Sequence, residues 1–139
     1  MSDNLIRDAV LAKTSLPTVK RALDLAALRQ KITAGNMANA STPGYRRRAV
    51  DFEGELRKLV EPDRLAGVRT DPHHIPIGAS KDEPFRVTAE QEGQTNGINN
   101  VDVEKEMVDL ARTQIWYQLG TTLARRKFSG LRLAIKGQR

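Results

Sequence analysis

Two long amphipathic segments stand at opposite ends of this 139-residue chain, and the stretch between them is polar and rich in proline. The first segment covers about 16–40 and the second about 102–135. Only six residues are aromatic, so a chain of this size has few large rings with which to bury a core of its own. The layout predicts a mainly α-helical fold. Long N- and C-terminal helices pair as an α-helical coiled coil, and an irregular middle loop holds one candidate β-hairpin.

The first segment repeats apolar and small residues on a heptad and carries a second apolar stripe beside it. Ser15 is a candidate N-cap, and Pro17 falls in the first turn, where its missing N–H breaks no helical hydrogen bond. A heptad seam is narrow, so two stripes indicate two faces that need cover. The residues expected to pack are Leu16, Val19, Leu23, Leu28 and Ile32.

The first helix is expected to end near Ser41, because Thr42-Pro43-Gly44 follows and the residue before a proline avoids the helical conformation. The Pro-Gly pair suits the two central positions of a type II turn, in which glycine supplies the positive φ. Asn36 and Asn39 lie just before this turn, and a buried amide without a partner is unfavourable. We therefore expect both to hydrogen-bond with the turn or with an adjacent subunit.

The second segment has Asn100 or Asp102 as its expected N-cap, with Glu104 and Glu106 in the first turn, where the helix dipole favours anions. Gly137 is the expected stop. This segment also carries two stripes, so pairing the two helices leaves one stripe of each in need of neighbouring subunits. The residues expected to pack are Met107, Leu110, Ile115, Tyr117, Leu123, Phe128 and Leu131.

The chain divides on this basis into five parts. Residues 1–15 form a flexible or short-helix segment, 16–40 the N-terminal coiled-coil helix, 41–57 the turn and the segment after it, 58–100 the irregular middle region and 101–139 the C-terminal coiled-coil helix. Within the middle region, 85–88 is the best strand candidate and 65–69 a second one. Asn96-Gly97 is a tight-turn signal.

The net charge of +6 fits a nucleic acid, an anionic lipid or an acidic protein surface as partner. The basic residues are dispersed, apart from triplets at 46–48 and 125–127, and no aromatic residues interleave them as in a base-stacking surface. The first triplet is either a docking patch or a solvated loop. A small nucleic-acid-binding coiled coil therefore remains the alternative function from another class, and steeply salt-dependent DNA binding would support it.

Catalytic and metal-binding patterns are weak. The chain has no cysteine, and its two histidines, His73 and His74, are adjacent, so on an extended segment they point to opposite sides. The carboxylates of Glu53, Glu55 and 102–106 lie at polar helix starts, where we expect them to be solvated or to face the helix dipole. No apolar run has the length of a membrane span. We expect no enzyme activity, no cofactor and no metal.

The stretch from Asn36 to Tyr45 reads N-M-A-N-A-S-T-P-G-Y and resembles the N-terminal signature of bacterial flagellar rod and hook proteins. Further segments at 50–52, 69–75, 99–107 and 126–132 are similar to the proximal rod proteins of this superfamily; a distal rod protein is the nearest alternative. The resemblance covers nearly the whole chain. It implies an assembly motif of Asn36, Asn39, Thr42, Pro43, Gly44 and Tyr45.

The same resemblance implies a structural subunit that transmits torque in the rod of the flagellar basal body, in the periplasmic space. It implies export through the flagellar type III gate without a cleaved signal, and Phe52 and Leu56 match the loose pattern associated with export recognition. The implied partners are other rod proteins and further copies of the chain, the rod–MS-ring adaptor and the MS ring. Nucleic acid and small-molecule substrates are not implied.

Overall fold

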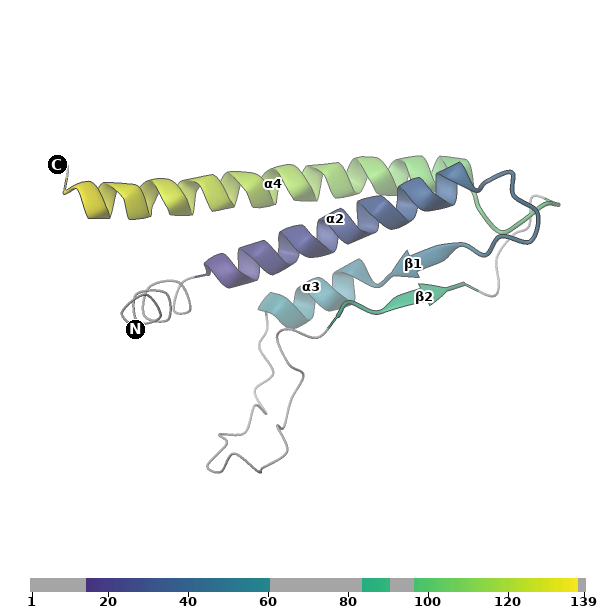
Figure 1. The fold of residues 1–139 in the computed structure, drawn as a ribbon, viewed down its shortest axis with the longest axis horizontal. Helices are drawn as coiled ribbons and strands as arrows, with labels where there is room; N and C mark the ends of the chain where they lie inside the picture. The colour runs from purple at the N-terminus through teal and green to yellow at the C-terminus, as the bar shows by residue number, and fades with distance from the viewer. Residues whose placement is uncertain (1–14, 61–83, 91–96, 138–139) are drawn as a thin grey trace, which may run out of the picture.

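The computed structural model describes residues 15–60, 84–90 and 97–137 of the chain. In these ranges the elements follow one another as α2 (Leu16–Ala38), β1 (Arg48–Val50), α3 (Phe52–Val60), β2 (Val87–Ala89) and α4 (Val103–Lys136). The two long helices, α2 and α4, lie side by side and run in opposite directions, with α3 and the strands on the other side of α2 (Figure 1). The prediction of a mainly α-helical fold with paired terminal helices is confirmed.

Helix α2 starts and ends close to the expected positions. Pro17 lies in its first turn, but the Ser15 side chain makes no capping hydrogen bond, so the prediction of a side-chain cap is wrong. The carbonyl of Ser15 instead accepts a hydrogen bond from the Val19 amide at 3.0 Å. The helix ends at Ala38, and Asn39 occupies the C-cap position.

Helix α4 has the predicted signals at both ends. The Asp102 side chain accepts a hydrogen bond from the Lys105 amide at 3.2 Å, which caps the first turn. Gly137 closes the helix with a φ of 60°, a left-handed conformation that glycine adopts without strain. At 34 residues the helix is about 50 Å long, and it extends well past the first residue of α2 (Figure 1).

The core lies between α2, β1 and α3. Its buried residues are Leu25, Ala26, Val50 and Phe52, with Leu28, Ile32, Leu56 and Phe85 packed against them. Helix α3 was not predicted, because 41–57 was read as a turn and the segment after it. Its acidic residues lie in the first turn and its basic residues in the last, as the helix dipole favours, so this charge order was the signal that could have indicated it.

The two strands form a small antiparallel sheet in which Arg48 pairs with Ala89 and Val50 with Val87. The strand expected at 85–88 is present as 87–89. The structure has a small two-stranded sheet in which β2, from the middle region, pairs with β1, which precedes that region; most of the middle region lies outside the described residues. A local alternation of residue types cannot indicate a partner this far away along the chain. The strand expected at 65–69, the two histidines and residues 1–14 lie outside the described residues.

The contact between α2 and α4 is rotated by one residue from the predicted seam. The fully buried positions of α4 are Glu106 and Thr113, and Gly120, seven residues further on, faces Leu23 of α2. The predicted seam row ran through Met107 and Phe128, which are exposed. Apolar periodicity missed the true row because its residues are acidic, polar and small.

The other predicted packing residues divide between buried and open positions. Leu16 is buried, whereas Val19, Leu23, Leu28, Ile32, Leu110 and Leu131 are half-buried. Ile115, Tyr117 and Leu123 are exposed in the single chain together with Met107 and Phe128. Helix α4 therefore offers apolar surface that α2 does not cover.

Candidate functional site

The motif that follows α2 folds into a tight turn. The Tyr45 amide donates to the Thr42 carbonyl at 3.2 Å, and Gly44 has a φ of 71°. With Pro43 and Gly44 at the two central positions, this is the predicted type II turn. The Thr42 amide also donates to the Asn39 carbonyl at 2.9 Å, which ties the turn to the end of the helix.

Asn36 is fully buried and connects α2 to the first strand. Its Nδ2 donates to the Arg48 carbonyl at 2.8 Å, and its Oδ1 accepts from the Arg48 amide at 3.0 Å and from the Tyr45 hydroxyl at 3.2 Å. The side chain therefore satisfies both backbone groups of Arg48, as a neighbouring strand would. The expected bond to the Thr42–Gly44 turn is absent for Asn36.

Asn39 does bond to the turn. Its Oδ1 accepts from the Thr42 hydroxyl at 3.3 Å, and its Nδ2 donates to the Gly35 carbonyl at 2.8 Å. The Gly35 carbonyl also accepts from the Asn39 amide at 3.2 Å, so Asn39 binds this carbonyl through both its backbone and its side chain.

Asn99 closes the same helix end from a distant part of the chain, and sequence reasoning gave it no role. Its Nδ2 lies 3.0 Å from the Asn39 carbonyl, 2.8 Å from the Ala40 carbonyl and 3.0 Å from the Thr42 carbonyl. Its Oδ1 accepts from the Val101 amide at 2.9 Å. Asn99 is buried, so one amide holds the end of α2 against the segment that leads into α4.

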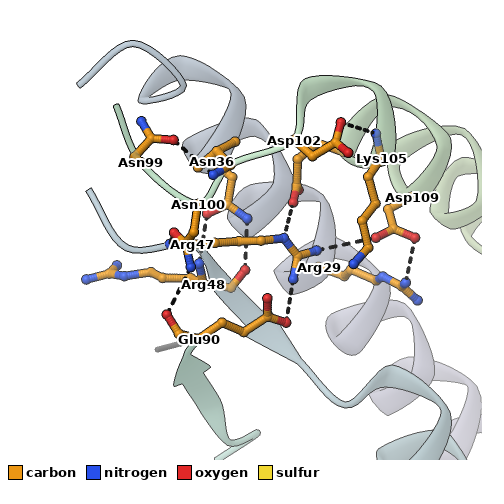
Figure 2. A network of polar contacts seen from close by, with 12 residues as sticks. Arg29, Asn36, Arg47, Arg48, Glu90, Asn99, Asn100, Asp102, Lys105 and Asp109 are labelled. Carbon is orange, nitrogen blue, oxygen red and sulfur yellow. Dashed lines mark hydrogen bonds and ion pairs between the residues drawn. The ribbon is translucent and has the colours of Figure 1, made fainter. Parts of the chain in front are cut away.

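Arg47 is the centre of a buried charge network (Figure 2). Its Nε lies 2.5 Å from Glu106 Oε1 and its Nη1 lies 2.6 Å from Glu90 Oε1. Its Nη2 lies 3.5 Å from Asp109 Oδ2, and Asp109 also accepts from Arg29 Nη2 at 3.1 Å. We call these five residues the Arg47 network. Through their side chains it joins α2 and α4 to the residues that flank the strands, because Arg47 precedes β1 and Glu90 follows β2.

The backbone beside the network is tied together as well. The Arg47 amide donates to Asn100 Oδ1 at 2.7 Å, and Asn100 Nδ2 donates to the Glu90 carbonyl at 3.0 Å. The Glu90 amide completes the set by donating to the Arg47 carbonyl at 2.9 Å. Asn100 is therefore not the cap of α4, which is Asp102, but the link between both strands and that helix start.

The structure corrects two expectations about these charges. The triplet at 46–48 is expected to be a docking patch or a solvated loop, but Arg47 is buried, while Arg46 and Arg48 are exposed. Glu106 is expected to be solvated or to face the helix dipole; it does lie in the first turn of α4, but it is only 1% exposed. The sequence hides this pair because its members come from different halves of the chain.

The surroundings of Arg47 keep its guanidinium charged. Burial by itself lowers the pKa of Arg47, but the hydrogen bonds and negative charges of Glu106 and Glu90 outweigh it and raise the pKa above its ordinary value. A buried ion pair gains little net stability, because both charges lose their hydration, yet removing one partner is strongly destabilising. The Arg47 network therefore fixes how the elements meet more than it adds to the free energy of unfolding.

The two residues matched to an export pattern lie in or against the core. Phe52 is buried, with its ring centroid 6.0 Å from that of Trp116 and the Arg29 guanidinium 5.1 Å from its own centroid. Leu56 packs against the same core cluster. In the folded chain both residues have a packing role; a role in export stays a prediction.

A hollow beside the network is lined by Arg29, Arg47, Glu90 and Asp109, among others. These charged groups are already engaged with one another. In the part of the chain that the structure describes, histidines and carboxylates nowhere gather into a group of three that could hold a metal ion. Within the same residues, no helix combines the length and apolar character of a membrane span.

Comparison with known proteins places this geometry in a family. The family model described as flagella basal body rod protein matches residues 17–46, which include all of α2 except its first residue, and the turn. The flagellar basal body rod protein FlgB of Bacillus subtilis is 34% identical over 125 residues, covering 88% of this chain and 94% of the relative. FlgB of Salmonella typhimurium is 35% identical over 127 residues, covering 85% and 90%. The chain therefore belongs to the FlgB family of flagellar basal body rod proteins.

Proposed function

We propose that this chain, a structural subunit of the basal body rod by its family, assembles into a helical, torque-transmitting shaft as part of the proximal rod. It leaves the cytoplasm through the flagellar type III export gate without signal cleavage and assembles in the periplasmic space. Its partners are further copies of itself, other rod proteins, the rod–MS-ring adaptor and the MS ring. The chain works mechanically, without catalysis and without a cofactor.

The observation that carries this proposal is the outer stripe of α4, formed by Val108, Ile115, Leu119 and Leu133. Residues two positions apart on a helix differ by about 200°, so Ile115 lies opposite the buried Thr113 and faces away from α2. Ile115 is 68% exposed, and the other members of the stripe are also exposed. A row of large apolar side chains on one open face marks a surface for other proteins.

Helix α4 has α2 on one face and an exposed apolar stripe on the opposite face, and this arrangement favours open-ended assembly. Helix α2 already occupies one face of α4, and we infer that a neighbouring subunit covers the outer stripe. A contact between unlike surfaces that does not close into a ring generates a helix of subunits. This is the geometry that a shaft requires.

The junction at the other end of the helices supports a mechanical role. Hydrogen bonds of the assembly motif hold the end of α2 on the first strand; its members are Asn36, Asn39, Thr42 and Tyr45, with Pro43 and Gly44 in the turn. Asn99 and the Arg47 network fix the start of α4 to the same place. We propose that the assembly motif acts by making this junction stiff, so that a twist applied to one helix reaches the other.

Export through a narrow gate requires an unfolded chain, and this fits the position of Phe52 and Leu56. Both are shielded in the folded state, so an export receptor would read them before folding. A variant of Phe52 would therefore affect stability and export together. The two effects are separated by measuring secretion in cells and unfolding of the purified protein.

The proposal is tested by Ile115→Asp, with Gln114→Asp as the matched control that puts the same charge on an exposed position about 100° around the helix from Ile115. Ile115→Asp is expected to leave folding and secretion intact and to abolish swimming and copurification with rod proteins. Gln114→Asp is expected to behave as wild type. Normal rods in cells that carry Ile115→Asp would refute the proposed role of the stripe.

A further inference from the structure

The rows of α4 that contain the outer stripe also carry basic residues. Each row repeats every seven residues, as the contact positions of a coiled coil do. The first row is Arg112, Leu119, Arg126 and Leu133, and the second is Val108, Ile115, Thr122, Ser129 and Lys136. All of these side chains are exposed. A helix that covers the outer stripe therefore lies against the cations of Arg112, Arg126 and Lys136.

The charge along this face has one sign. Arg125 and Arg132 each precede a residue of the first row, so they flank the contact positions. Beyond Asp109, α4 contains no acidic residue. Asp109 itself is bonded within the Arg47 network, and Glu106 is buried there. Within α4, Glu104 in the first turn is thus the one acidic side chain that stays exposed.

The α4 helix of a second copy is a poor partner for this face. If two α4 helices packed in parallel and in register, Arg112 would face its own equivalent, and so would Arg126. Like charges that face each other oppose association. In an antiparallel pair, the basic half of one α4 would meet at most one exposed carboxylate of the other, that of Glu104.

The remaining described helices of a second copy are no better suited. Helix α2 carries Lys20, Arg21, Arg29 and Lys31, and Asp24 is its one acidic residue. In α3 the acidic residues of the first turn are balanced by the basic residues of the last turn. Within the described part of the chain, no helix therefore carries a net negative charge.

We propose that the outer stripe binds an amphipathic helix of a different protein, whose contact face carries carboxylates opposite Arg112, Arg126 and Lys136. Leu119 and Leu133 supply apolar contact, and the arginines beside them select an acidic partner, as charged residues of a coiled coil select theirs. Arginine suits this role because its guanidinium can bind a carboxylate through two parallel hydrogen bonds.

This inference rests on the proposed function, because it names the partner of the surface on which that function depends. A shaft that contains more than one protein satisfies both, since the subunit that covers the outer stripe then differs from the subunit that it covers.

The first test uses the purified full-length protein and two synthetic amphipathic helices of about three heptads. Both peptides have the same isoleucine and leucine face, with glutamates at and beside this face in one peptide and lysines in the other. The glutamate peptide is expected to bind at least about tenfold more tightly, and its advantage is expected to shrink as salt screens the charges. Fluorescence anisotropy measures both affinities, and equal binding of the two peptides would overturn the inference.

Arg126→Glu locates the effect on the outer stripe. It is expected to weaken binding of the glutamate peptide at least about tenfold, because like charges then meet at a contact position. Lys127→Glu is the matched control, since it changes the net charge equally at an exposed position about 100° around the helix. Its affinity is expected to fall less than about twofold. Circular dichroism of each variant establishes that lost binding is not lost helix, and equal losses in the two variants would contradict the proposed face.

A photo-cross-linking residue in place of Leu119 identifies the partner in cells. The expected product joins this chain to an acidic helix of a different rod protein, located by mass spectrometry, and Arg126→Glu is expected to remove it. A cross-link between two copies of this chain would overturn the inference and leave the proposed function standing. The lack of any cross-link would contradict both, because the outer stripe would then be uncovered.

Discussion

Arg47 Nε lies 2.5 Å from Glu106 Oε1, although the two residues are 59 positions apart in the chain. The pair joins the start of the longest helix to the strand that follows the turn, and Glu90 and Asp109 bring two further carboxylates to the same guanidinium. Arginine suits this position because its planar fork can serve several carboxylates at once. The junction of the two helices is thus built on charge, beside an apolar core.

Glu106→Ala is expected to destabilise the protein by about 3–5 kcal/mol, because it leaves a buried guanidinium without its nearest partner. Glu104→Ala is the matched control, since Glu104 lies in the same first turn but is exposed. Its loss is expected to stay below about 1 kcal/mol, the size of a helix-dipole contribution. Urea unfolding of the purified variants measures both values, and equal losses would contradict the network's role.

Asn99→Asp is expected to be more damaging than Asn99→Ala. The alanine variant leaves the carbonyls of Asn39, Ala40 and Thr42 without a side-chain donor, a loss of about 1–3 kcal/mol. The aspartate variant keeps the shape but places negative oxygens against the same carbonyls, so repulsion adds to the loss. The measurement is the urea midpoint together with hydrogen exchange at 39–45. If Asn99→Ala proved less stable than Asn99→Asp, the Asn99 side chain would not hold the end of α2 by donating to these carbonyls.

The raised pKa of Arg47 has a defined consequence for stability at high pH. A group whose folded-state pKa exceeds its unfolded value contributes stability below the unfolded pKa and loses it as the pH rises through the folded pKa. For Arg47 the pH range in which this stability is lost lies above the alkaline range used for proteins. In Arg47→Lys the loss of stability starts near pH 10, because the ordinary pKa of lysine is about 10.4.

Arg47→Lys is therefore expected to be less stable than wild type at pH 7, and the difference in stability is expected to stay constant up to about pH 10 and to widen between about pH 10 and about pH 11, as lysine loses its charge. Thermal melts of both proteins across this range measure the gap. Arg46→Lys is the control, because Arg46 is exposed and its replacement is expected to leave the gap at zero. A constant difference between Arg47→Lys and wild type would mean that the charge is not what the site requires.

The sequence predicted the parts of the fold that depend on local rules. The two long helices, the Asp102 cap, the stop at Gly137 and the type II turn each follow from a few neighbouring residues. The pairing of β1 with β2 and the burial of Arg47 and Glu106 could not be predicted in this way. Each depends on segments that meet only after the helices have packed.

The α2–α4 seam illustrates the same limit. An apolar repeat located the helices correctly but placed the contact one residue away, because Glu106, Thr113 and Gly120 hold the buried row. Glu106 is buried only because Arg47 neutralises it, and Gly120 lies at the contact because it lacks a side chain. Neither reason is visible in a hydrophobicity pattern.

Gly120 and Gly130 provide a matched pair that tests how closely the two helices approach. An added Cβ at Gly120 would lie 2.8 Å from Leu23 Cδ2 and 3.2 Å from Leu23 Cγ, whereas one at Gly130 meets nothing within 4 Å among the described residues. Glycine in a helix interior is about 1 kcal/mol less favourable than alanine. Gly130→Ala is therefore expected to stabilise the protein by about that amount.

Gly120→Ala is expected to lose this gain, because the new methyl group forces Leu23 out of its position and separates α2 from α4. Gly120→Leu extends the test, since overpacking a contact costs about 1–3 kcal/mol. Thermal melts of the three variants give the order Gly130→Ala, Gly120→Ala, Gly120→Leu from most to least stable. Equal stabilisation by the two alanine variants would mean that Leu23 yields freely and that the close approach at Gly120 does not hold the helices together.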